Sequence, residues 1–401
     1  MNETGMELAA GGWQLGAGDS RLSDDQNVES ELHMTDTLQT ISEKRSAYGL
    51  GLLDWQREMT EVRKLPKFRA DQIMKGLYCE QKTSWDAFTT LPTTLRAELT
   101  EQIPIEPMQL VEESPSRDGT NKLLLACPSD GEKIETVLIP SKGRMTQCIS
   151  TQAGCAFRCA FCASGQLGKR RDLTSAEIVG QVMESIRLLT AQSGTYTRPS
   201  NIVVMGMGEP FDNYDNVLRA LKILNDQKGL DIGARHITIS SCGVVPGIQR
   251  LATEGLQFEL SISLHAPTQE LRRELMPVSR RWPLDELIDA CAAYTKATGR
   301  LVTFEYTLID RLNDQPQDAR ALIALLRRLP CKVNLIPLSP VEGFPGRRPE
   351  NRACLAFLDL LMKARIPTTM RNSRGRDVDA ACGQLRLRRL KEELPPQGGK
   401  E

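Results

Sequence analysis

The sequence of 401 residues has no run of about 18 apolar residues, which is the length that a membrane-spanning helix needs. It also begins without the basic segment followed by an apolar segment that marks a secretory signal. Both absences predict a protein that has no membrane segment and is cytoplasmic. The 11 cysteines are an odd number scattered through the chain, which favours a reducing compartment over a disulfide framework.

The sequence has no net charge either, with 51 basic and 51 acidic side chains, and such a balance by itself argues against a nucleic-acid partner. The balance is uneven, because residues 1–44 hold nine acidic and two basic side chains and the remainder holds 49 basic and 42 acidic ones. Basic clusters in the remainder together permit a polyanionic substrate, although each one alone is typical of a solvated surface. These clusters are Lys169-Arg170-Arg171, Arg272-Arg273, Arg280-Arg281-Trp282, Arg347-Arg348, 371–376 and 386–391.

The first third of the chain predicts two small regions after a tail. Residues 1–46 are rich in Gly, Ser, Asp and Glu without a sustained period, which predicts a disordered acidic tail. Residues 47–103 have helical periodicity and predict a small helical accessory domain. Residues 104–144 contain strand-like runs divided by turn signals and predict a β-hairpin linker region. The helical apolar stripes are Phe68, Ile73, Met74, Leu77 and Tyr78, then Trp85, Phe88, Leu91 and Leu95; the strand-like runs are 122–126 and 134–139.

Residues 145–385 form the predicted core, in which strand-like and helix-like segments alternate. Thr174 and Glu177 are spaced as a capping box where the first long helix is expected. Six such units predict an α/β fold whose parallel sheet forms a partial (β/α)6 barrel, like a TIM barrel with fewer strands. In a barrel of this kind the chemistry gathers at the carboxyl ends of the strands. The strands are expected near 145–150, 201–205, 236–240, 258–264, 301–308 and 332–337, and residues 386–401 are expected to form a charged tail.

Three cysteines, Cys155, Cys159 and Cys162, follow the first expected strand of the core within eight residues. Three thiolates can hold three irons of a 4Fe-4S cluster and leave the fourth iron open to another ligand. A structural zinc site completed by a distant Cys or His is an alternative, and so are three buried thiols. Zinc modules usually pair their ligands in two knuckles, which favours the cluster.

Five further stretches are distinctive: Cys148 to Cys155, Met205 to Pro210, Ser263 to Ala266, Asn334 to Pro337 and Ala380 to Leu385. With the cysteine triplet, they resemble the motifs of the radical S-adenosylmethionine (SAM) enzymes, and within these the RlmN/Cfr RNA methyltransferases. The similarity extends from about residue 67 to residue 385. It implies that the three cysteines ligate a 4Fe-4S cluster and that SAM chelates its open iron.

The resemblance also implies which residues hold SAM: Gly208, Glu209, Ser240, Ser263, His265 and Asn334. The residues themselves suit this role, because glycines let the backbone approach a ligand closely and Glu209 can accept from an ammonium group. Two alternatives stay open. The stretch from Gly206 to Gly208 is also typical of a tight turn that binds no cofactor. A lone histidine such as His265 is also typical of a core residue whose ring is hydrogen-bonded within the protein.

By the same resemblance, Cys382 carries the methyl group, Cys148 resolves the intermediate, and Glu135 accepts a proton. On its spacing alone Cys382 is an ordinary cysteine, although nearby arginines favour a thiolate. Glu135 also suits a solvent-facing strand carboxylate. In the implied reaction, one SAM methylates Cys382, a second is cleaved reductively to a radical that activates the methyl group, and Cys148 then forms a disulfide with Cys382 to release the base.

The implied substrate is carbon 2 of an adenosine in the peptidyl-transferase centre of 23S rRNA, and of the adenosine 3′ of certain tRNA anticodons. Such a base has to leave its stack to enter a site of this kind. The implied partners include a reductant such as flavodoxin or ferredoxin, and we expect a monomer. Two alternatives remain: a Cfr-type enzyme that methylates carbon 8, and a non-catalytic RNA-binding protein whose cysteines hold a structural metal.

Overall fold

The computed structural model describes residues 45–339, 341 and 343–371. The predicted acidic tail up to residue 44, the motif at 380–385 that contains Cys382, and the charged tail at 386–401 lie outside the described residues. In the part of the chain that is described, no helix combines the length and the apolar character that crossing a membrane requires.

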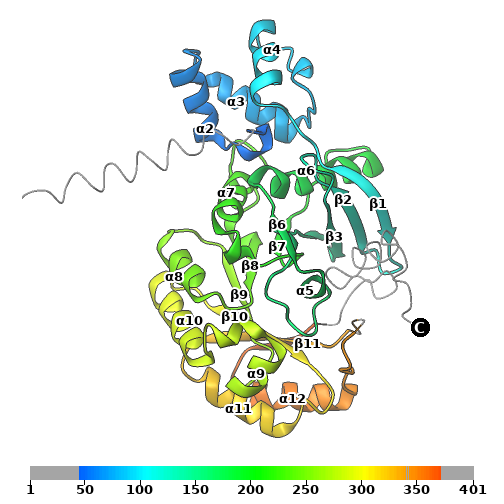
Figure 1. The fold of residues 1–401 in the computed structure, drawn as a ribbon, viewed down its shortest axis with the longest axis vertical. Helices are drawn as coiled ribbons and strands as arrows, with labels where there is room; N and C mark the ends of the chain where they lie inside the picture. Colours follow the sequence, from blue (N-terminus) through cyan, green and yellow to red (C-terminus); the bar gives the residue numbers. More distant parts are fainter. Residues whose placement is uncertain (1–44, 340, 342, 372–401) are drawn as a thin grey trace, which may run out of the picture. The chain divides into compact units, whose positions relative to one another are not determined.

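The described chain begins with short helices, as predicted for this region (Figure 1). Ile73, Met74 and Leu77 are fully buried, and the rings of Trp55 and Trp85 meet edge to face at 5.7 Å. Phe68 is 51% exposed, so its assignment to the buried stripe is wrong. At 3.6 residues per turn, Phe68 lies on the opposite side of the helix from Ile73 and Leu77. The helices are η1 (Ala47–Gly49), α2 (Leu52–Arg57), η2 (Glu58–Val62), α3 (Phe68–Met74), η3 (Lys75–Cys79), η4 (Trp85–Ala87) and α4 (Thr93–Gln102).

A ten-stranded sheet forms the centre of the described structure, in the order β1-β2-β3-β4-β7-β8-β9-β10-β11-β12. The strands from β4 to β12 pair in parallel, and β1 and β12 are the two edges, which gives a partial barrel. The six core strands predicted from the sequence are confirmed: β4 (Arg144–Cys148), β7 (Asn201–Val204), β8 (Ile237–Ser241), β9 (Glu259–Ser263), β10 (Val302–Leu308) and β11 (Cys331–Pro337). A seventh parallel strand, β12 (Thr368–Met370), was not predicted, because three residues are too few to show a period.

The region expected to be a β-hairpin linker extends this same sheet. Strands β1 (Gln109–Pro115), β2 (Asn121–Ala126) and β3 (Lys133–Ser141) are antiparallel, and β3 pairs with β4. The turn between β3 and β4 contains Gly143, whose φ of 76° suits glycine. Strand β3 therefore lies next to β4, the first strand of the core, and β2 lies on the other side of β3.

Helices alternate with the parallel strands, as the sequence predicts. The capping box at the start of α6 is confirmed, since the Glu177 amide donates to Thr174 Oγ1 at 3.2 Å and the Thr174 amide donates to Glu177 Oε2 at 2.9 Å. Because every crossover returns the chain to the same end of the sheet, the carboxyl ends of the parallel strands meet at one edge. The helices are α5 (Ala163–Leu167), α6 (Ser175–Ser193), η5 (Pro210–Asp212), α7 (Tyr214–Asn225), η6 (Ala234–His236), α8 (Val245–Thr253), α9 (Gln269–Leu275), η7 (Pro277–Arg280), α10 (Leu284–Thr298), α11 (Pro316–Leu326) and α12 (Asn351–Lys363).

We expect Gly76→Ala to destabilise the helical region. A Cβ at Gly76 would lie 2.2 Å from Cε1 of the buried Phe88 ring, and overpacking of this kind costs about 1–3 kcal/mol. Gly180→Ala in α6 is the matched control, because its Cβ would meet only the flexible side chain of Met108, at 2.9 Å. Alanine also favours a helix over glycine by about 1 kcal/mol. Urea unfolding followed by circular dichroism measures both variants, and equal losses of stability would contradict the packing argument.

Candidate active site

A two-stranded antiparallel pair, β5 (Gln152–Gly154) and β6 (Lys169–Asp172), frames the loop that carries the three cysteines. The Cys155 amide donates to the Gly168 carbonyl at 3.0 Å where the loop closes. Gly154 has a φ of 84°, and a Cβ there would lie 1.7 Å from that carbonyl oxygen. Glycine is therefore required at 154 for the two ends of the loop to approach each other.

The three thiols are partly buried and close enough to affect one another. Burial raises the pKa of Cys155 to about 12, with a further rise from Cys162. Burial also raises the pKa of Cys159, and both Cys155 and Cys162 raise it further. Cys155 and Cys159 therefore resist ionisation, and such thiols release their protons when a metal cation binds them.

The spacing of the three sulfur atoms is wider than a single zinc ion requires. Zinc–sulfur bonds of about 2.3 Å place tetrahedral ligands about 4 Å apart. Within the described residues, the one group of three potential ligands that all lie within 4.8 Å of one another is Cys127, Asp130 and Glu177, and it contains none of the three loop cysteines. The donor set of the loop therefore fits a larger iron–sulfur cluster better than one zinc ion.

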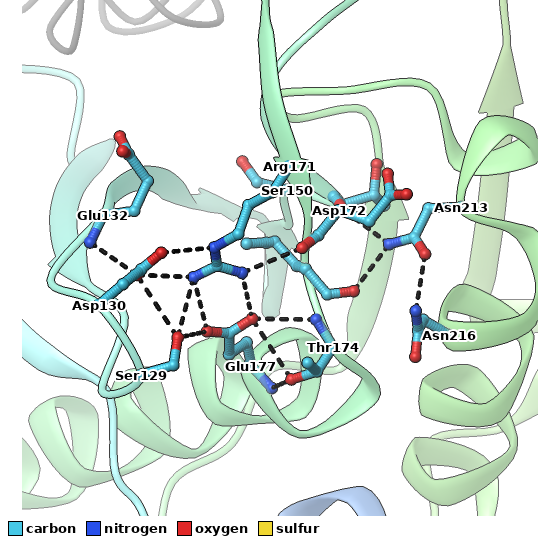
Figure 2. A network of polar contacts seen from close by, with 12 residues as sticks. Ser129, Asp130, Glu132, Ser150, Arg171, Asp172, Thr174, Glu177, Asn213 and Asn216 are labelled. Carbon is cyan, nitrogen blue, oxygen red and sulfur yellow. Dashed lines mark hydrogen bonds and ion pairs between the residues drawn. The ribbon is translucent and has the colours of Figure 1, made fainter. Parts of the chain in front are cut away.

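The group of Cys127, Asp130 and Glu177 already holds a cation, because the Arg171 guanidinium lies between its carboxylates (Figure 2). Arg171 Nε lies 2.7 Å from Asp130 Oδ2, and Nη1 lies 2.8 Å from Glu177 Oε2. Arg171 lowers the pKa of Asp130 to about 2. This network anchors β6 to the start of α6 and to the turn between β2 and β3.

The first basic cluster predicted from the sequence lies at the surface, but its side chains pair with carboxylates of the protein itself. Lys169 pairs with Asp212 at 2.8 Å, Arg170 pairs with Glu132 at 2.8 Å, and Arg171 pairs as described above. The expectation that these three residues help to bind a polyanion is weakened, because their charges are already balanced by carboxylates.

The loop that follows β7 packs directly on the segment before the cysteines. The Gly206 amide donates to the Ile149 carbonyl at 3.0 Å, and the Met207 amide donates to Ser150 Oγ at 2.9 Å. A Cβ at Gly206 would lie 2.6 Å from the Ile149 oxygen, and Gly208 has a φ of 104°. The close packing at Gly206 and the positive φ of Gly208 therefore agree with the interpretation of the stretch as a tight turn.

Glu209 is buried at the end of this loop and accepts two backbone hydrogen bonds. Its Oε1 accepts from the Phe211 amide at 3.1 Å, and its Oε2 accepts from the Cys242 amide at 2.7 Å, after the end of β8. Burial raises the pKa of Glu209 although both hydrogen bonds oppose the rise. The side chains of Ser241 and Cys242 also hydrogen-bond this carboxylate and lower its pKa.

Polar side chains form a row across the parallel strands, and the sequence prediction missed its centre, Glu305. Ser263, Glu305 and Asn334 are in register on β9, β10 and β11, so they share one face of the sheet. Ser240 Oγ on β8 donates to Glu305 Oε2 at 3.2 Å, and Asn334 also hydrogen-bonds this carboxylate. Three of the residues predicted to hold SAM therefore lie around one buried acid.

A charged residue between Phe304 and Tyr306 in an apolar strand was the signal that could have identified Glu305. Burial raises its pKa, while the nearby Arg371 and the two hydrogen bonds lower it. The Thr369 hydroxyl on β12 donates to Asn334 Oδ1 at 3.1 Å, so the row continues onto the strand that was not predicted.

His265 follows β9 and joins this row to the cysteine loop. It has a φ of 57°, and its Nδ1 accepts from the Thr307 amide at 2.9 Å. Burial lowers the pKa of His265 to about 3, so the ring is neutral and its proton is on Nε2. The ring meets Phe161 of the cysteine loop edge to face at 4.8 Å. His265 is therefore buried, its Nδ1 is hydrogen-bonded, and its ring contacts the cysteine loop.

Cys148 lies at the carboxyl end of β4, beside a buried ion pair that the sequence prediction did not foresee. Lys122 Nζ on β2 lies 3.0 Å from Glu135 Oε2 on β3, with side-chain exposures of 0% and 3%. The interpretation of Glu135 as a solvent-facing carboxylate is therefore wrong. Cys148 is in register with Val137, which also pairs with Lys122, so Lys122, Glu135 and Cys148 share one face of the sheet.

Burial raises the pKa of the Cys148 thiol to about 11, with a smaller opposing effect from Arg371. Arg371 thus lies near both Cys148 and Glu305, and it is the last described residue before the motif that contains Cys382. The structure brings together Cys148 with Glu135, the SAM-binding candidates with Glu305, and His265 with the cysteine loop. The position of Cys382 lies outside the described residues.

Residues 149–323 match the model of the radical SAM superfamily. The partial barrel and the cysteine loop at its strand ends thus define a radical SAM enzyme. A probable dual-specificity RNA methyltransferase RlmN from Akkermansia muciniphila is 44% identical, over 82% of this chain and 91% of that protein. A relative with the same name from Enterococcus faecalis is 43% identical, over 88% of this chain and 98% of that protein.

The crystal structure of a radical SAM methyltransferase from Sphaerobacter thermophilus matches with a TM-score of 0.80 at 45% identity, over 85% of this chain and 98% of that chain. The chain belongs to the RlmN family of radical SAM RNA methyltransferases. It is an S-adenosylmethionine-dependent RNA methyltransferase, and its cofactors are a 4Fe-4S cluster and SAM. The alternative of a non-catalytic RNA-binding protein with a structural metal is therefore wrong.

We expect Glu305→Gln to change the pH dependence of stability. Because burial raises the folded pKa of Glu305, the folded protein keeps a proton that the unfolded chain has already lost, and stability falls as pH rises through this window. The variant should gain stability relative to the wild type as the pH rises above about 4.5, the ordinary pKa of the carboxyl, by about 1.4 kcal/mol for each unit of pKa shift. Urea unfolding of the cofactor-free protein at several pH values measures the difference.

Thr303→Val, two residues earlier on β10, is the control for this series, because it removes a polar group that does not titrate. Its stability difference from the wild type should stay constant with pH. A Glu305→Gln difference that is also constant with pH would show that the carboxyl is not destabilised by burial.

Proposed function

We propose that this enzyme methylates carbon 2 of adenosine, in the peptidyl-transferase centre of 23S rRNA and in tRNA 3′ of the anticodon. The relatives named dual-specificity RNA methyltransferases are matched over more than nine tenths of their length, which supports the same two classes of RNA for this chain. These substrates place the proposed reaction in the cytoplasm. We also propose a monomeric enzyme without a membrane partner and an electron donor such as flavodoxin or ferredoxin.

The observation that carries the proposal is the position of Cys148. Its half-buried thiol lies on the strand that leads into the cysteine loop, and on the same face as Glu135. A further thiol, beside the three of a loop that binds a cluster, has no role in a protein that only carries electrons. It does have a role where a covalent bond between protein and substrate has to be broken.

The residues assigned to the cofactors are those of the sequence prediction. Cys155, Cys159 and Cys162 would ligate the cluster, and the donor set and its wide spacing fit this role. Gly208, Glu209, Ser240, Ser263, His265 and Asn334 would hold SAM, with Glu305 added as the acid that orients Ser240 and Asn334. Together the two cofactors supply the methyl group and the one-electron chemistry needed at a ring carbon that polar methylation cannot reach.

The remaining steps belong to side chains of the protein. Cys382 would act as a thiolate that accepts and carries the methyl group. Cys148 would then attack the sulfur of Cys382, which releases the modified base and leaves a disulfide for a reductant to reopen. The 11 residues from Arg371 to Cys382 can span up to about 36 Å, so the position of Arg371 allows this encounter.

Glu135, or a water molecule beside it, would take the proton from the ring carbon. Its ion pair with the buried Lys122 holds the carboxyl on the face of the sheet that carries Cys148. Because the pKa of Cys148 is raised to about 11, this thiol stays protonated at neutral pH until it is needed. A protonated thiol does not attack the methylated sulfur of Cys382 early, which keeps the steps in order.

Mass spectrometry of 23S rRNA and tRNA from cells with and without the gene tests the proposed substrates directly. Loss of 2-methyladenosine from both RNAs supports the proposal. Loss of a carbon-8 methyl group instead would identify a Cfr-type enzyme, and an unchanged tRNA would restrict the substrate to rRNA.

We expect Cys382→Ala to abolish methylation of RNA while the iron and sulfide content of the protein stays normal. The substitution removes the proposed methyl carrier and leaves the three cluster ligands in place. Methyl transfer from labelled SAM to RNA is the measurement, with Cys79→Ala in the helical region as a control that should keep full activity. Undiminished base methylation in Cys382→Ala would exclude the carrier role.

We expect Cys148→Ala to accumulate RNA that is covalently attached to the protein. Without the second thiol, the methylated base has no route off Cys382 and turnover stops after one cycle. Denaturing gels with labelled RNA detect the attached species, and Cys331→Ala, a buried cysteine on β11, is the control that should give none. Full turnover without an attached species would contradict the resolving role of Cys148.

A further inference from the structure

Arg272 on α9 is a fully buried guanidinium without an acidic partner. Its side chain has 0% exposure, and no carboxylate among the described residues lies within ion-pair distance of it. Nη2 donates to the Cys242 carbonyl at 2.7 Å and to the Ser263 carbonyl at 3.3 Å. Within the described part of the chain nothing accepts from Nε or Nη1. A buried charge in this state costs several kcal/mol, which requires a physical explanation.

Three thiols and the neutral ring of His265 lie within electrostatic range of Arg272. Three cysteine thiols, Cys242, Cys159 and Cys291, raise its pKa, and burial has the larger, opposite effect. One of them, Cys159, is the middle member of the loop triplet. The cysteine loop is also tied to α9 directly, because the Ala160 amide donates to the carbonyl of Leu275 at 2.9 Å. The helix that carries the unpaired cation therefore supports the loop whose thiols gain negative charge when iron binds.

The backbone of Gly243 packs against the Arg272 side chain. A Cβ at Gly243, where φ is 106°, would lie 3.0 Å from Nη2 of Arg272. The two carbonyls that Arg272 bonds belong to residues at or just past the ends of β8 and β9, the edge where the cofactors bind. The neighbouring Arg273 is exposed, so one position on the same helix separates a solvated arginine from a buried one.

We propose that Arg272 is the built-in counter-charge of the iron–sulfur cluster: its guanidinium, which no carboxylate among the described residues balances, offsets the thiolate charge of the loaded cysteine triplet. The role rests on the cofactor of the family and not on the proposed substrate. Arg272 touches neither substrate nor cofactor in this account, so it is a positioning residue that acts through charge. A cation buried beside the cluster favours its reduced form, because reduction adds one negative charge.

The test uses the reconstituted enzyme without RNA, so its outcome is independent of the methylation target. Arg272→Met removes the charge, Arg272→Gln removes the charge but keeps an N–H donor, and Arg272→Lys keeps the charge. We expect the two neutral variants to lose iron to a chelator about tenfold faster than the wild type, as removal of a partly screened charge predicts. The reduced fraction at a fixed potential should fall about tenfold, which is 59 mV for one electron.

Redox titration followed by electron paramagnetic resonance measures the potential, and Arg272→Lys should restore most of it. Arg273→Met is the matched control and should leave both quantities unchanged. The cofactor-free neutral variants should be at least as stable as the cofactor-free wild type, because an uncompensated charge has been removed. Wild-type potential and iron retention in Arg272→Gln, a lysine variant that behaves like the neutral ones, or neutral variants that do not fold without the cluster would each overturn the proposal.

Discussion

The buried side chain of Gln152 joins the two loops on which the active site depends. Its Oε1 accepts from the Glu209 amide at 2.9 Å, and its Nε2 donates to Asp172 at 2.7 Å and to Asp212 at 2.8 Å. One amide thus connects the strand before the cysteines, the strand after them and the loop that follows β7. The bond to the Glu209 amide is buried, so loss of this partner costs about 1–3 kcal/mol, whereas the two carboxylates are partly exposed.

The polar interior of the barrel follows from register more than from local sequence. Parallel pairing places Ser263, Glu305 and Asn334 side by side, although they are 42 and 29 positions apart in the chain. A shift of one residue in any strand would turn its polar side chain to the opposite face. The apolar residues that alternate with them, such as Phe304 and Leu335, are fully buried and resist such a shift. Hydrophobic packing on one face therefore determines the chemistry on the other.

The parts of this structure that the sequence predicted are those encoded over short distances. The spacing of Cys155, Cys159 and Cys162, the capping box at Thr174 and the six core strands are all local patterns, and the strands and the box are confirmed. The short strands β5, β6 and β12 were missed because three or four residues show no period.

Lys122, Glu305 and Arg272 were missed, or assigned to the surface, for a different reason. Whether a charged residue in a strand or helix is buried depends on which segments pack over it, and these segments are distant in sequence. Arg272 and Arg273 look alike in the sequence, yet one is fully buried and the other is exposed. The sequence does not show which distant segments pack over these charged residues, and the fold does.

Two cations, Lys122 and Arg272, are fully buried in the part of the chain that the structure describes, and they show how charge is divided inside it. Lys122 is paired within the protein with Glu135, so this ion pair adds no net charge beside Cys148, whose thiol burial keeps protonated. Arg272 has no such partner among the described residues, and three thiols, one of them Cys159 of the loop, act on its charge. A fold that pairs one buried cation and leaves the other unpaired holds a positive charge where a negatively charged cofactor binds. The unpaired charge destabilises the empty protein and stabilises the loaded one, which couples the stability of the barrel to the presence of its cluster.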